Sequence, residues 1–352
     1  MSKKPLILGI ESSCDETAAS LITENEEGFP VVLSNIVSSQ VEVHREFGGV
    51  VPELAARSHI EKIDWIVKKA IDESGRKIEE IDAVASTAGP GLIVCLSVGL
   101  SFGKAFATAM NKPFIAVNHL EGHALSPKLN TNLNYPYLLL LISGGHSQYL
   151  SVQNLGKYKR LGTTIDDALG EAFDKTAKLL GIEFPGGPQI EILAKKGDPE
   201  KYDLPKPIFS KGGCNLSFAG LKTAVLKISK TIKSEQDKYD LAASFQKTIE
   251  EILYKKTKIA FTEFEKINEL NEKIFVVAGG VAANKKIRSM LINLCEENNY
   301  KSIFPPIEFC GDNAAMIAMV GLEKFKINQF DDLDYPAKPR WPLDEDAAFL
   351  KG

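Results

Sequence analysis

The sequence predicts an α/β fold with a duplicated sheet core, and three observations support this prediction. Apolar runs of strand length alternate with helical patterns along the chain. Glycine-bearing turns follow several of the strands. A strand, a polar turn and a second strand occur twice, in residues 6–22 and in residues 137–152. Alternating strands and helices are typical of α/β folds, and the repeat half a chain later indicates two related halves.

Length and composition are those of a globular protein with more than one core. The chain has 352 residues, of which 44% are hydrophobic and 25% charged, and this balance excludes a disordered or fibrous chain. Such a length favours two lobes. We expect residues 1–133, completed by the C-terminal helix and tail at 313–352, to form the first lobe and residues 134–312 to form the second.

The sequence also predicts a cytoplasmic protein that does not associate with a membrane. No apolar run approaches the roughly 18–20 residues that a membrane span needs, and the apolar run after the N-terminus is too short for a signal peptide. The five cysteines are never spaced as C-x-x-C, which argues against a disulfide framework and a thiolate zinc site. A net charge of −4 argues against an extensive nucleic-acid-binding surface, but local basic patches remain compatible with it.

Helical periodicity and turn residues predict the remaining elements of the first half. A helix is predicted over residues 52–74, a strand over 83–86 before a Gly-Pro-Gly turn at 89–91, and a helix over 99–110. The apolar face of the first helix consists of Leu54, Ile60, Ile63, Ile66, Val67 and Ala70.

The second half repeats this alternation with longer helices. Helices are predicted over residues 166–180, near 190–196 and over 239–266, with a Pro-Gly-Gly-Pro break at 185–188 and a loop-rich stretch at 197–216. A strand at 273–278, a Gly-Gly turn and a helix from about Asn284 to Glu297 complete the pattern. An Ala/Met-rich helix follows Asp312.

The sharpest chemical signal is the segment Asn118-His119-Leu120-Glu121-Gly122-His123. Histidines four residues apart lie on one face of a helix, where two imidazole nitrogens reach one metal ion. Asn118 is a candidate cap for that helix. The spacing alone leaves open whether the pair binds a metal or consists of two ordinary helix histidines. A zinc peptidase would carry Glu directly after the first histidine, where this chain has Leu120.

Asp312 is the best candidate for a third metal ligand. It is predicted to follow a short apolar strand and to precede a helix, so the alternative role is a helix N-cap. Two histidines and one carboxylate leave coordination positions open, a pattern typical of sites that bind substrate rather than of closed structural sites. This ligand set accepts iron and zinc equally well.

Glycine-bearing turns form the second signal. In the turn Ser143-Gly144-Gly145-His146, glycine permits backbone N–H groups to converge on an anion. A single Gly-Gly turn is usually only a hairpin, but a related turn follows the first strand, and Gly279-Gly280 precedes a helix that begins at Asn284. Together these turns favour a nucleotide site without a Walker lysine.

Two weaker signals lie in the second half. Asp174, in an acidic helix, is a candidate acceptor for ligand hydroxyl groups, with Gly187 allowing close backbone approach; the alternative is a solvated helix face. Residues 195–238 contain ten lysines and five acidic residues. This local excess of positive charge is compatible with neutralisation of nucleic-acid phosphates and with an ordinary solvated surface.

Taken together, these motifs resemble the bacterial members of the universal tRNA threonylcarbamoyladenosine transferase family. The resemblance runs from about Ile7 to Leu343, and six motifs in the family's order make it specific. They are GIESSCDET at residues 9–17, NHLEGH at 118–123, SGGH at 143–146, GEAFDK at 170–175, GGVAAN at 279–284 and DNA at 312–314.

The resemblance implies an actin/hexokinase-like (ASKHA) fold of two lobes around a nucleotide cleft. It also implies transfer of a threonylcarbamoyl group from its adenylate to the exocyclic amine of the adenosine 3′ of the anticodon in tRNAs reading codons that begin with A, with release of AMP. Implied partners are tRNA, a paralogous ASKHA protein and a P-loop ATPase. The implied cofactor is one divalent metal per subunit, with Fe(II) expected and Zn(II) possible.

The same resemblance assigns roles to individual residues. The implied metal ligands are His119, His123 and Asp312, and Glu11 and His146 are the candidate catalytic residues, with a structural role for Glu11 equally open. The implied donor-binding residues are Ile142, Ser143, Gly144, Gly145, His146, Asp174, Gly187, Glu191 and Asn284. Two other functions remain as alternatives: a metal-dependent endopeptidase and a non-catalytic ASKHA scaffold that binds nucleotide.

Overall fold

The computed structural model describes residues 4–348. The chain divides into two compact units: Met1–Leu133 with Pro305–Glu345, and Asn134–Phe304 with Asp346–Gly352. The second lobe was expected to end at residue 312, whereas the first unit resumes at Pro305. The carbonyl oxygen of Pro305 lies 3.7 Å from Cys310 Sγ in the same unit. The tail after Glu345 groups with the second unit, where Arg160 donates a hydrogen bond to the carbonyl oxygen of Ala348.

The first unit is built on a five-stranded sheet in the order β3-β2-β1-β4-β5. Its strands are β1 (Ile7–Glu11), β2 (Glu16–Glu24), β3 (Pro30–Ser39), β4 (Ala83–Gly89) and β5 (Phe114–Asn118). The first three strands pair antiparallel, whereas β1–β4 and β4–β5 are parallel. Every residue of β1, β4 and β5 is buried, as expected of strands covered on both faces.

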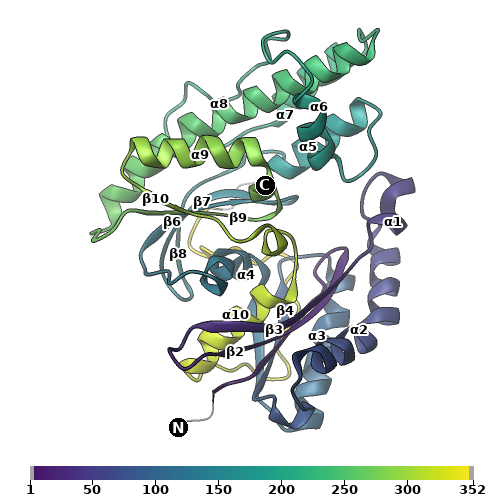
Figure 1. Cartoon of the computed structure of the whole chain (residues 1–352), viewed down its shortest axis with the longest axis vertical. Helices are drawn as coiled ribbons and strands as arrows, with labels where there is room; N and C mark the ends of the chain where they lie inside the picture. Colours follow the sequence, from purple (N-terminus) through teal and green to yellow (C-terminus); the bar gives the residue numbers. More distant parts are fainter. Residues whose placement is uncertain (1–3, 349–352) are drawn as a thin grey trace. The chain divides into compact units, whose positions relative to one another are not determined.

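Helices cover the two faces of this sheet (Figure 1). On one face lie α2 (Pro52–Ser74) and α3 (Ile93–Met110), and on the other lie α10 (Ala314–Lys326) and α4 (His119–Leu125). Glycine permits the close contact on the second face: a Cβ atom at Gly321 of α10 would lie 2.6 Å from the Cβ atom of Ala85 in β4. Helix α10 therefore lies directly on the strands that lead to the functional residues.

The sequence predicted α2 with its observed bounds but not all of its buried face. Ile63, Ile66, Val67 and Ala70 are buried as expected, whereas Ile60 is 64% exposed and Ser58 and His59 are buried instead. The polar side chains are buried because they have partners: His59 Nδ1 lies 2.7 Å from Thr17 Oγ1.

Helix α3 begins six residues earlier than predicted, at Ile93. Over its 18 residues the mean hydropathy is 1.6, and by length and composition this helix is apolar enough to cross a membrane. The expectation that no segment reaches this threshold is therefore wrong. A face that includes Leu96, Gly99 and Gly103 is buried, and the helix packs against β4 and α2, as core helices of α/β proteins do.

A buried histidine network supports the β1–β2 turn. His59 Nε2 lies 3.0 Å from the carbonyl oxygen of Cys14 in that turn. Gln40 donates from Nε2 to His59 Nδ1 over 3.3 Å, and its Oε1 lies 3.3 Å from Nε2 of His44, the last residue of α1 (Val41–His44). Both imidazoles are fully buried. The turn is therefore attached to α1 and α2 through buried polar side chains.

This network predicts a loss of stability in acid. Burial lowers the pKa of His59 below its ordinary value of 6.5, although Glu11 and Asp15 act to raise it. Unfolded chains therefore take up a proton below about pH 6.5 that the folded chain binds only at lower pH, and stability falls as the pH decreases from there. Urea unfolding at several pH values should give a steeper acid loss in the parent than in His59→Gln, by at most about 1.4 kcal/mol per pH unit. Equal slopes would show that His59 does not contribute.

The second unit repeats the sheet of the first. Its strands are β6 (Tyr137–Ile142), β7 (Ser147–Asn154), β8 (Lys157–Thr163), β9 (Ile274–Ala278) and β10 (Lys301–Ile303). Their order is β10-β9-β6-β7-β8, with β6–β7 and β7–β8 antiparallel and β6–β9 and β9–β10 parallel. In each sheet the first strand of the unit, β1 or β6, begins two successive antiparallel pairings on one side and two successive parallel pairings on the other. The predicted duplicated α/β core is thereby confirmed.

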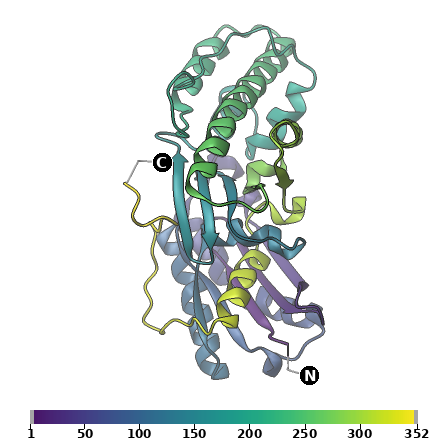
Figure 2. The same ribbon diagram turned by 90° about the vertical axis from the view of Figure 1, so that its left-hand side faces the viewer.

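Long helices pack together in the second unit (Figure 2). They are α5 (Leu169–Leu179), α6 (Gly186–Ala194), α7 (Ala219–Ser229), α8 (Glu235–Ile267) and α9 (Lys285–Glu297). The predicted break at residues 185–188 is wrong in part, because α6 begins inside it: Gly186 donates its N–H to Asp174 Oδ1 over 2.8 Å, which stabilises the helix start. Helix α7 was not predicted, and α8 is longer than predicted at its N-terminal end, where Ser234 caps it.

Candidate functional site

The two histidines of the NHLEGH segment lie in the buried helix α4 at the end of β5. Asn118 ends the strand and caps the helix, with its Oδ1 accepting a hydrogen bond from Leu120 N over 2.9 Å. His119 and His123 follow one turn apart on one face, with ring centroids 4.8 Å apart. The predicted cap and the predicted common face are both present.

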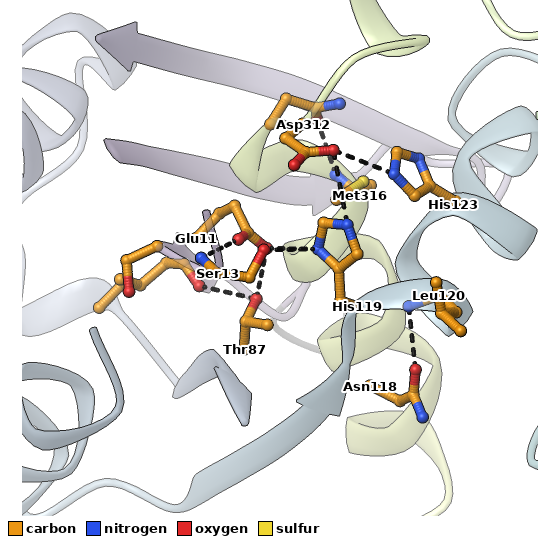
Figure 3. Close-up of polar contacts among 12 residues, drawn as sticks. Glu11, Ser13, Thr87, Asn118, His119, Leu120, His123, Asp312 and Met316 are labelled. Atoms are coloured by element: carbon orange, nitrogen blue, oxygen red, sulfur yellow. Dashed lines mark hydrogen bonds and ion pairs between the residues drawn. The ribbon is translucent and has the colours of Figure 1, made fainter. Parts of the chain in front are cut away.

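Asp312 meets both histidines (Figure 3). Its Oδ1 lies 3.1 Å from His123 Nε2 and 3.5 Å from His119 Nε2. A short 3-10 turn, η5 (Ile307–Phe309), precedes it instead of the expected strand, and the cap of α10 is Asn313. Because Asn313 caps the helix, the Asp312 carboxylate is left to face the histidines.

These three side chains have the composition and spacing of a metal-binding triad. Their candidate ligand atoms all lie within 4.8 Å of one another. With metal–ligand bonds of about 2.0–2.2 Å, neighbouring ligands in a tetrahedral or octahedral shell are roughly 2.8–3.6 Å apart, which includes both distances to Asp312. The triad therefore fits a divalent ion, and three protein ligands leave positions for substrate or water.

Glu11 supports His119 from the side opposite Asp312. Its Oε2 lies 3.1 Å from His119 Nδ1 and accepts a hydrogen bond from Thr87 Oγ1 over 2.6 Å, and its Oε1 accepts from Ser13 N over 2.5 Å. Ser13 Oγ is also 3.2 Å from His119 Nδ1. A carboxylate on the outer nitrogen fixes the tautomer in which Nε2 is free to bind a metal. With both carboxylate oxygens bonded, Glu11 is placed to orient a ligand rather than to touch substrate.

The other histidine lacks such support. Among the residues that the structure describes, His123 Nδ1 is buried without a hydrogen-bond partner. Its orientation therefore depends on packing and on Asp312.

Charge in the triad is shared between carboxylates and imidazoles. Burial acts to lower the pKa of His119, but the carboxylates of Asp312 and Glu11 outweigh it and hold this pKa well above its usual value. Burial acts to raise the pKa of Asp312, but His119 and His123 keep it well below the usual range. Without an ion the triad therefore holds a proton, which metal binding would displace.

The contacts of Glu11 predict a measurable loss of metal affinity on substitution. Glu11→Gln keeps the size of the side chain but removes the charge that pairs with His119. By the usual effect of outer-shell partners, we expect metal affinity to fall about 10–100-fold in a chelator-competition titration. Glu24→Gln is the matched control, because Glu24 pairs with Lys326 and not with the triad. Unchanged affinity in Glu11→Gln would argue against an orienting role.

The candidate donor-binding residues of the second unit start with the β6–β7 turn. Ser143 N donates to the carbonyl oxygen of His146 over 2.8 Å, and His146 N donates to Ser143 Oγ over 3.1 Å, so the turn is closed. Gly144 and Gly145 at its tip are exposed, while Ile142 before it is buried. Gly170, near the start of α5, donates its N–H to the carbonyl oxygen of Ser143 over 3.1 Å.

The remaining candidates lie in or next to the helices α5, α6 and α9 of the same unit. Asp174 accepts from Gly186 N at the start of α6, and a Cβ atom at Gly187 would lie 3.9 Å from Phe173 Cβ. Glu191 Oε1 accepts from Lys285 N at the start of α9 over 3.1 Å. Asn284 caps α9 through Oδ1 and donates from Nδ2 to Gln246 Oε1 over 3.0 Å. Gly187 and Asn284 thus lie at the N-terminal ends of α6 and α9, where backbone N–H groups favour an anionic ligand.

Comparison with known proteins identifies the family. A family model described as TsaD: tRNA N6-adenosine threonylcarbamoyltransferase matches residues 31–319, well over half of the chain. The chain belongs to this family. It is 81% identical over 352 residues to the tRNA N6-adenosine threonylcarbamoyltransferase of Pelagibacter ubique (strain HTCC1062), covering 100% of this chain and 99% of that one. It is 54% identical over 342 residues to the enzyme of that name from Rickettsia conorii (strain ATCC VR-613 / Malish 7), covering 96% and 98%. This family member is therefore an enzyme of the transferase class.

Two solved structures show the fold. HypF from T. kodakarensis matches with a TM-score of 0.62 and 14% identity, over 93% of this chain and 48% of that one. Full-length HypF in a phosphate- and nucleotide-bound form matches with a TM-score of 0.59 and 13% identity, over 94% and 48%. At this identity the likeness concerns the fold alone, and it confirms the predicted actin/hexokinase-like class.

Two residues near the triad, Thr87 and Lys324, were not singled out from the sequence, whereas Ser13 belongs to the turn after the first strand that was interpreted as a candidate anion site. Ser13 and Thr87 contact Glu11 or His119, and Lys324 of α10 lies 3.5 Å from Glu121. Ser13 lies inside a quoted motif, but Thr87 and Lys324 lie in an apolar strand and an apolar helix without any motif. The sequence signal that could have indicated Thr87 and Lys324 is a polar residue at a position where the pattern of the strand or helix predicts burial.

Proposed function

We propose that this chain transfers the threonylcarbamoyl group of threonylcarbamoyl-adenylate to N6 of the adenosine 3′ of the anticodon, in tRNAs reading codons that begin with A. The exocyclic amine attacks the carbonyl carbon of the mixed anhydride, the bond from that carbon to the phosphate oxygen breaks, AMP leaves, and the amine loses a proton. The observation that carries the proposal is the convergence of His119, His123 and Asp312 in a chain of this family.

The chemistry suits the residues at hand. The donor already contains a good leaving group, so no serine or cysteine nucleophile is needed, and holding amine and carbonyl together supplies a large part of the rate enhancement. A divalent ion at the triad, Fe(II) by family resemblance or Zn(II) by ligand chemistry, would supply Lewis acidity. The Ser143–Gly145 backbone and the starts of α6 and α9 would hold the adenylate. His146 is the proposed acceptor of the amine proton.

Glu11 is proposed as a positioning residue rather than a catalytic one, because its carboxylate is fully engaged by His119, Ser13 and Thr87. The peptidase alternative is disfavoured by Glu121, which is 4% exposed and paired with Lys324. That carboxylate is therefore not available to activate a water molecule beside the histidines. We further propose that the enzyme works in the cytoplasm with a paralogous ASKHA protein and a P-loop ATPase.

Reconstitution tests the proposal. The chain is combined with threonylcarbamoyl-adenylate, the partner proteins of its own organism and a tRNA transcript that reads a codon beginning with A. Nucleoside mass spectrometry should detect threonylcarbamoyladenosine and AMP in equal amounts, and a transcript with guanosine at the target position should give neither. Peptide cleavage without nucleoside product would favour the peptidase, and binding of nucleotide without turnover would favour the scaffold.

A further inference from the structure

We propose that Lys324 is a positioning residue for the metal-binding triad. It would do so by fixing β5 and α4, which carry the two histidines, to α10, which begins next to Asp312. The inference rests on the proposed function, because it takes the triad to bind a divalent ion.

Helix α10 is the element that both kinds of ligand share. Asp312 lies two residues before its first residue, Ala314. Helix α4 packs on the same helix: a Cβ atom at Gly122, next to His123, would lie 3.1 Å from Met316 Cγ and from Ile317 Cδ1. The separation of histidines and aspartate therefore depends on how α4 is held against α10.

Lys324 lies near the C-terminal end of α10 and reaches two groups of the histidine-bearing segment. Its Nζ donates to the carbonyl oxygen of Ala116 over 3.1 Å and lies 3.5 Å from Glu121 Oε2. Ala116 is in β5, two residues before the helix cap, and Glu121 lies between the histidines. One ammonium group thus contacts the segment on both sides of its strand-to-helix corner.

The position of Ala116 explains why a side chain is needed there. Strand β5 is at the edge of its sheet, so one of its sides lacks a neighbouring strand. On that side Ala116 N donates to Asp331 Oδ2 over 2.8 Å and Ala116 O accepts from Lys324. The side chains of Asp331 and Lys324 therefore make the hydrogen bonds to Ala116 that a sixth strand would otherwise make. Ala116 lies three residues before His119.

The Lys324–Glu121 ion pair is buried, so loss of either charge affects the position of α4. Lys324 is 7% exposed and Glu121 is 4% exposed. Removing one member of a buried ion pair leaves the other as an uncompensated buried charge, and the structure relaxes to bring that charge to water. Glu121 is buried within α4, so relaxation that shifts this helix displaces both histidines. Ligand side chains must be held to within about 0.5 Å to keep a site intact.

The test uses the full-length chain with Co(II) as the probe. Co(II) affinity is measured by chelator competition, the visible ligand-field spectrum reports coordination geometry, and urea unfolding reports stability. Lys324→Met keeps an unbranched apolar stem and removes the charge. We expect Co(II) affinity at least about 10-fold weaker, with an altered spectrum, similar to the loss of an outer-shell partner.

A second buried lysine provides the matched control. Lys256, in α8 of the other unit, is fully buried and donates from Nζ to the carbonyl oxygens of Lys211 and Gly213. Lys256→Met should lower stability and leave Co(II) affinity and spectrum unchanged. If Lys324→Met also leaves both unchanged, or weakens Co(II) binding no more than Lys256→Met does, the positioning role is refuted.

Two further variants keep the outcome decisive. If Lys324→Met does not fold, Glu121→Gln removes the same ion pair with less change in volume, and it should also weaken Co(II) binding and alter the spectrum. His119→Ala separates this proposal from the metal proposal. If His119→Ala binds Co(II) as tightly as the parent, the triad is not the metal site and the proposed function fails; if only the lysine variant matches the parent, the positioning inference alone fails.

Discussion

Asp312→Asn should remove transfer activity while the fold is retained. The substitution keeps the shape of the side chain but replaces the carboxylate that lies 3.1 Å from His123 Nε2 and 3.5 Å from His119 Nε2. A neutral amide is a much poorer metal ligand, so we expect metal affinity to fall by more than about 100-fold and nucleoside product to reach background. Metal content after dialysis and product formation are the two measurements.

Asp332→Asn is the control for this substitution, because Asp332 is an exposed carboxylate of the same unit. It should leave both measurements unchanged. A metal-depleted Asp312→Asn protein that still forms product at the parental rate would contradict the role of the triad in transfer.

Gly170→Ala should damage donor binding without affecting the metal site. A Cβ atom at this position would lie 2.7 Å from the carbonyl oxygen of Ser143 and 2.8 Å from the Cα atom of Gly144. Both contacts are to backbone, which cannot rotate away, so the β6–β7 turn must shift and its N–H groups lose their alignment. We expect the KM for threonylcarbamoyl-adenylate to rise at least about 10-fold, with metal affinity as in the parent.

Gly212→Ala is the matched control in the same unit, since a Cβ atom there meets nothing within 4 Å. Its KM should equal that of the parent. A normal KM in Gly170→Ala would mean that the β6–β7 turn does not bind the donor.

The repeated core was predictable because it depends on local patterns. The strand–turn–strand units and α2 have strong periodicity in sequence, and the structure shows them close to their predicted bounds. The missed strands β3 and β8 mix polar and apolar residues at the sheet edges, where exposure weakens the pattern. Strand β5 was also missed; it is fully buried but only five residues long, and periodicity does not distinguish so short an apolar run from a buried helix segment. The start of α6 was taken for a break because a contact with Asp174, twelve residues away in sequence, stabilises it.

The candidate metal site was predictable in part for a similar reason. His119 and His123 are four residues apart, so helix geometry alone places them together. Asp312 is 189 residues from His123, so residue type and a predicted helix start made it only a candidate ligand, with a helix cap as the alternative, and the resemblance to a family assigned it the role. Glu11 and Lys324 are also remote from the histidines in sequence. Their contacts follow from how α10 and β1 pack, which spacing does not encode.

Anomalous diffraction from crystals of the purified, active enzyme is the most direct test of the central claim that His119, His123 and Asp312 bind the catalytic metal. Data collected on both sides of the iron and zinc absorption edges identify the element and its position. We expect one peak per chain, about 2.0–2.2 Å from both imidazole Nε2 atoms and from one Asp312 oxygen. Active crystals with no peak at these three side chains, or with the metal bound elsewhere, would contradict it.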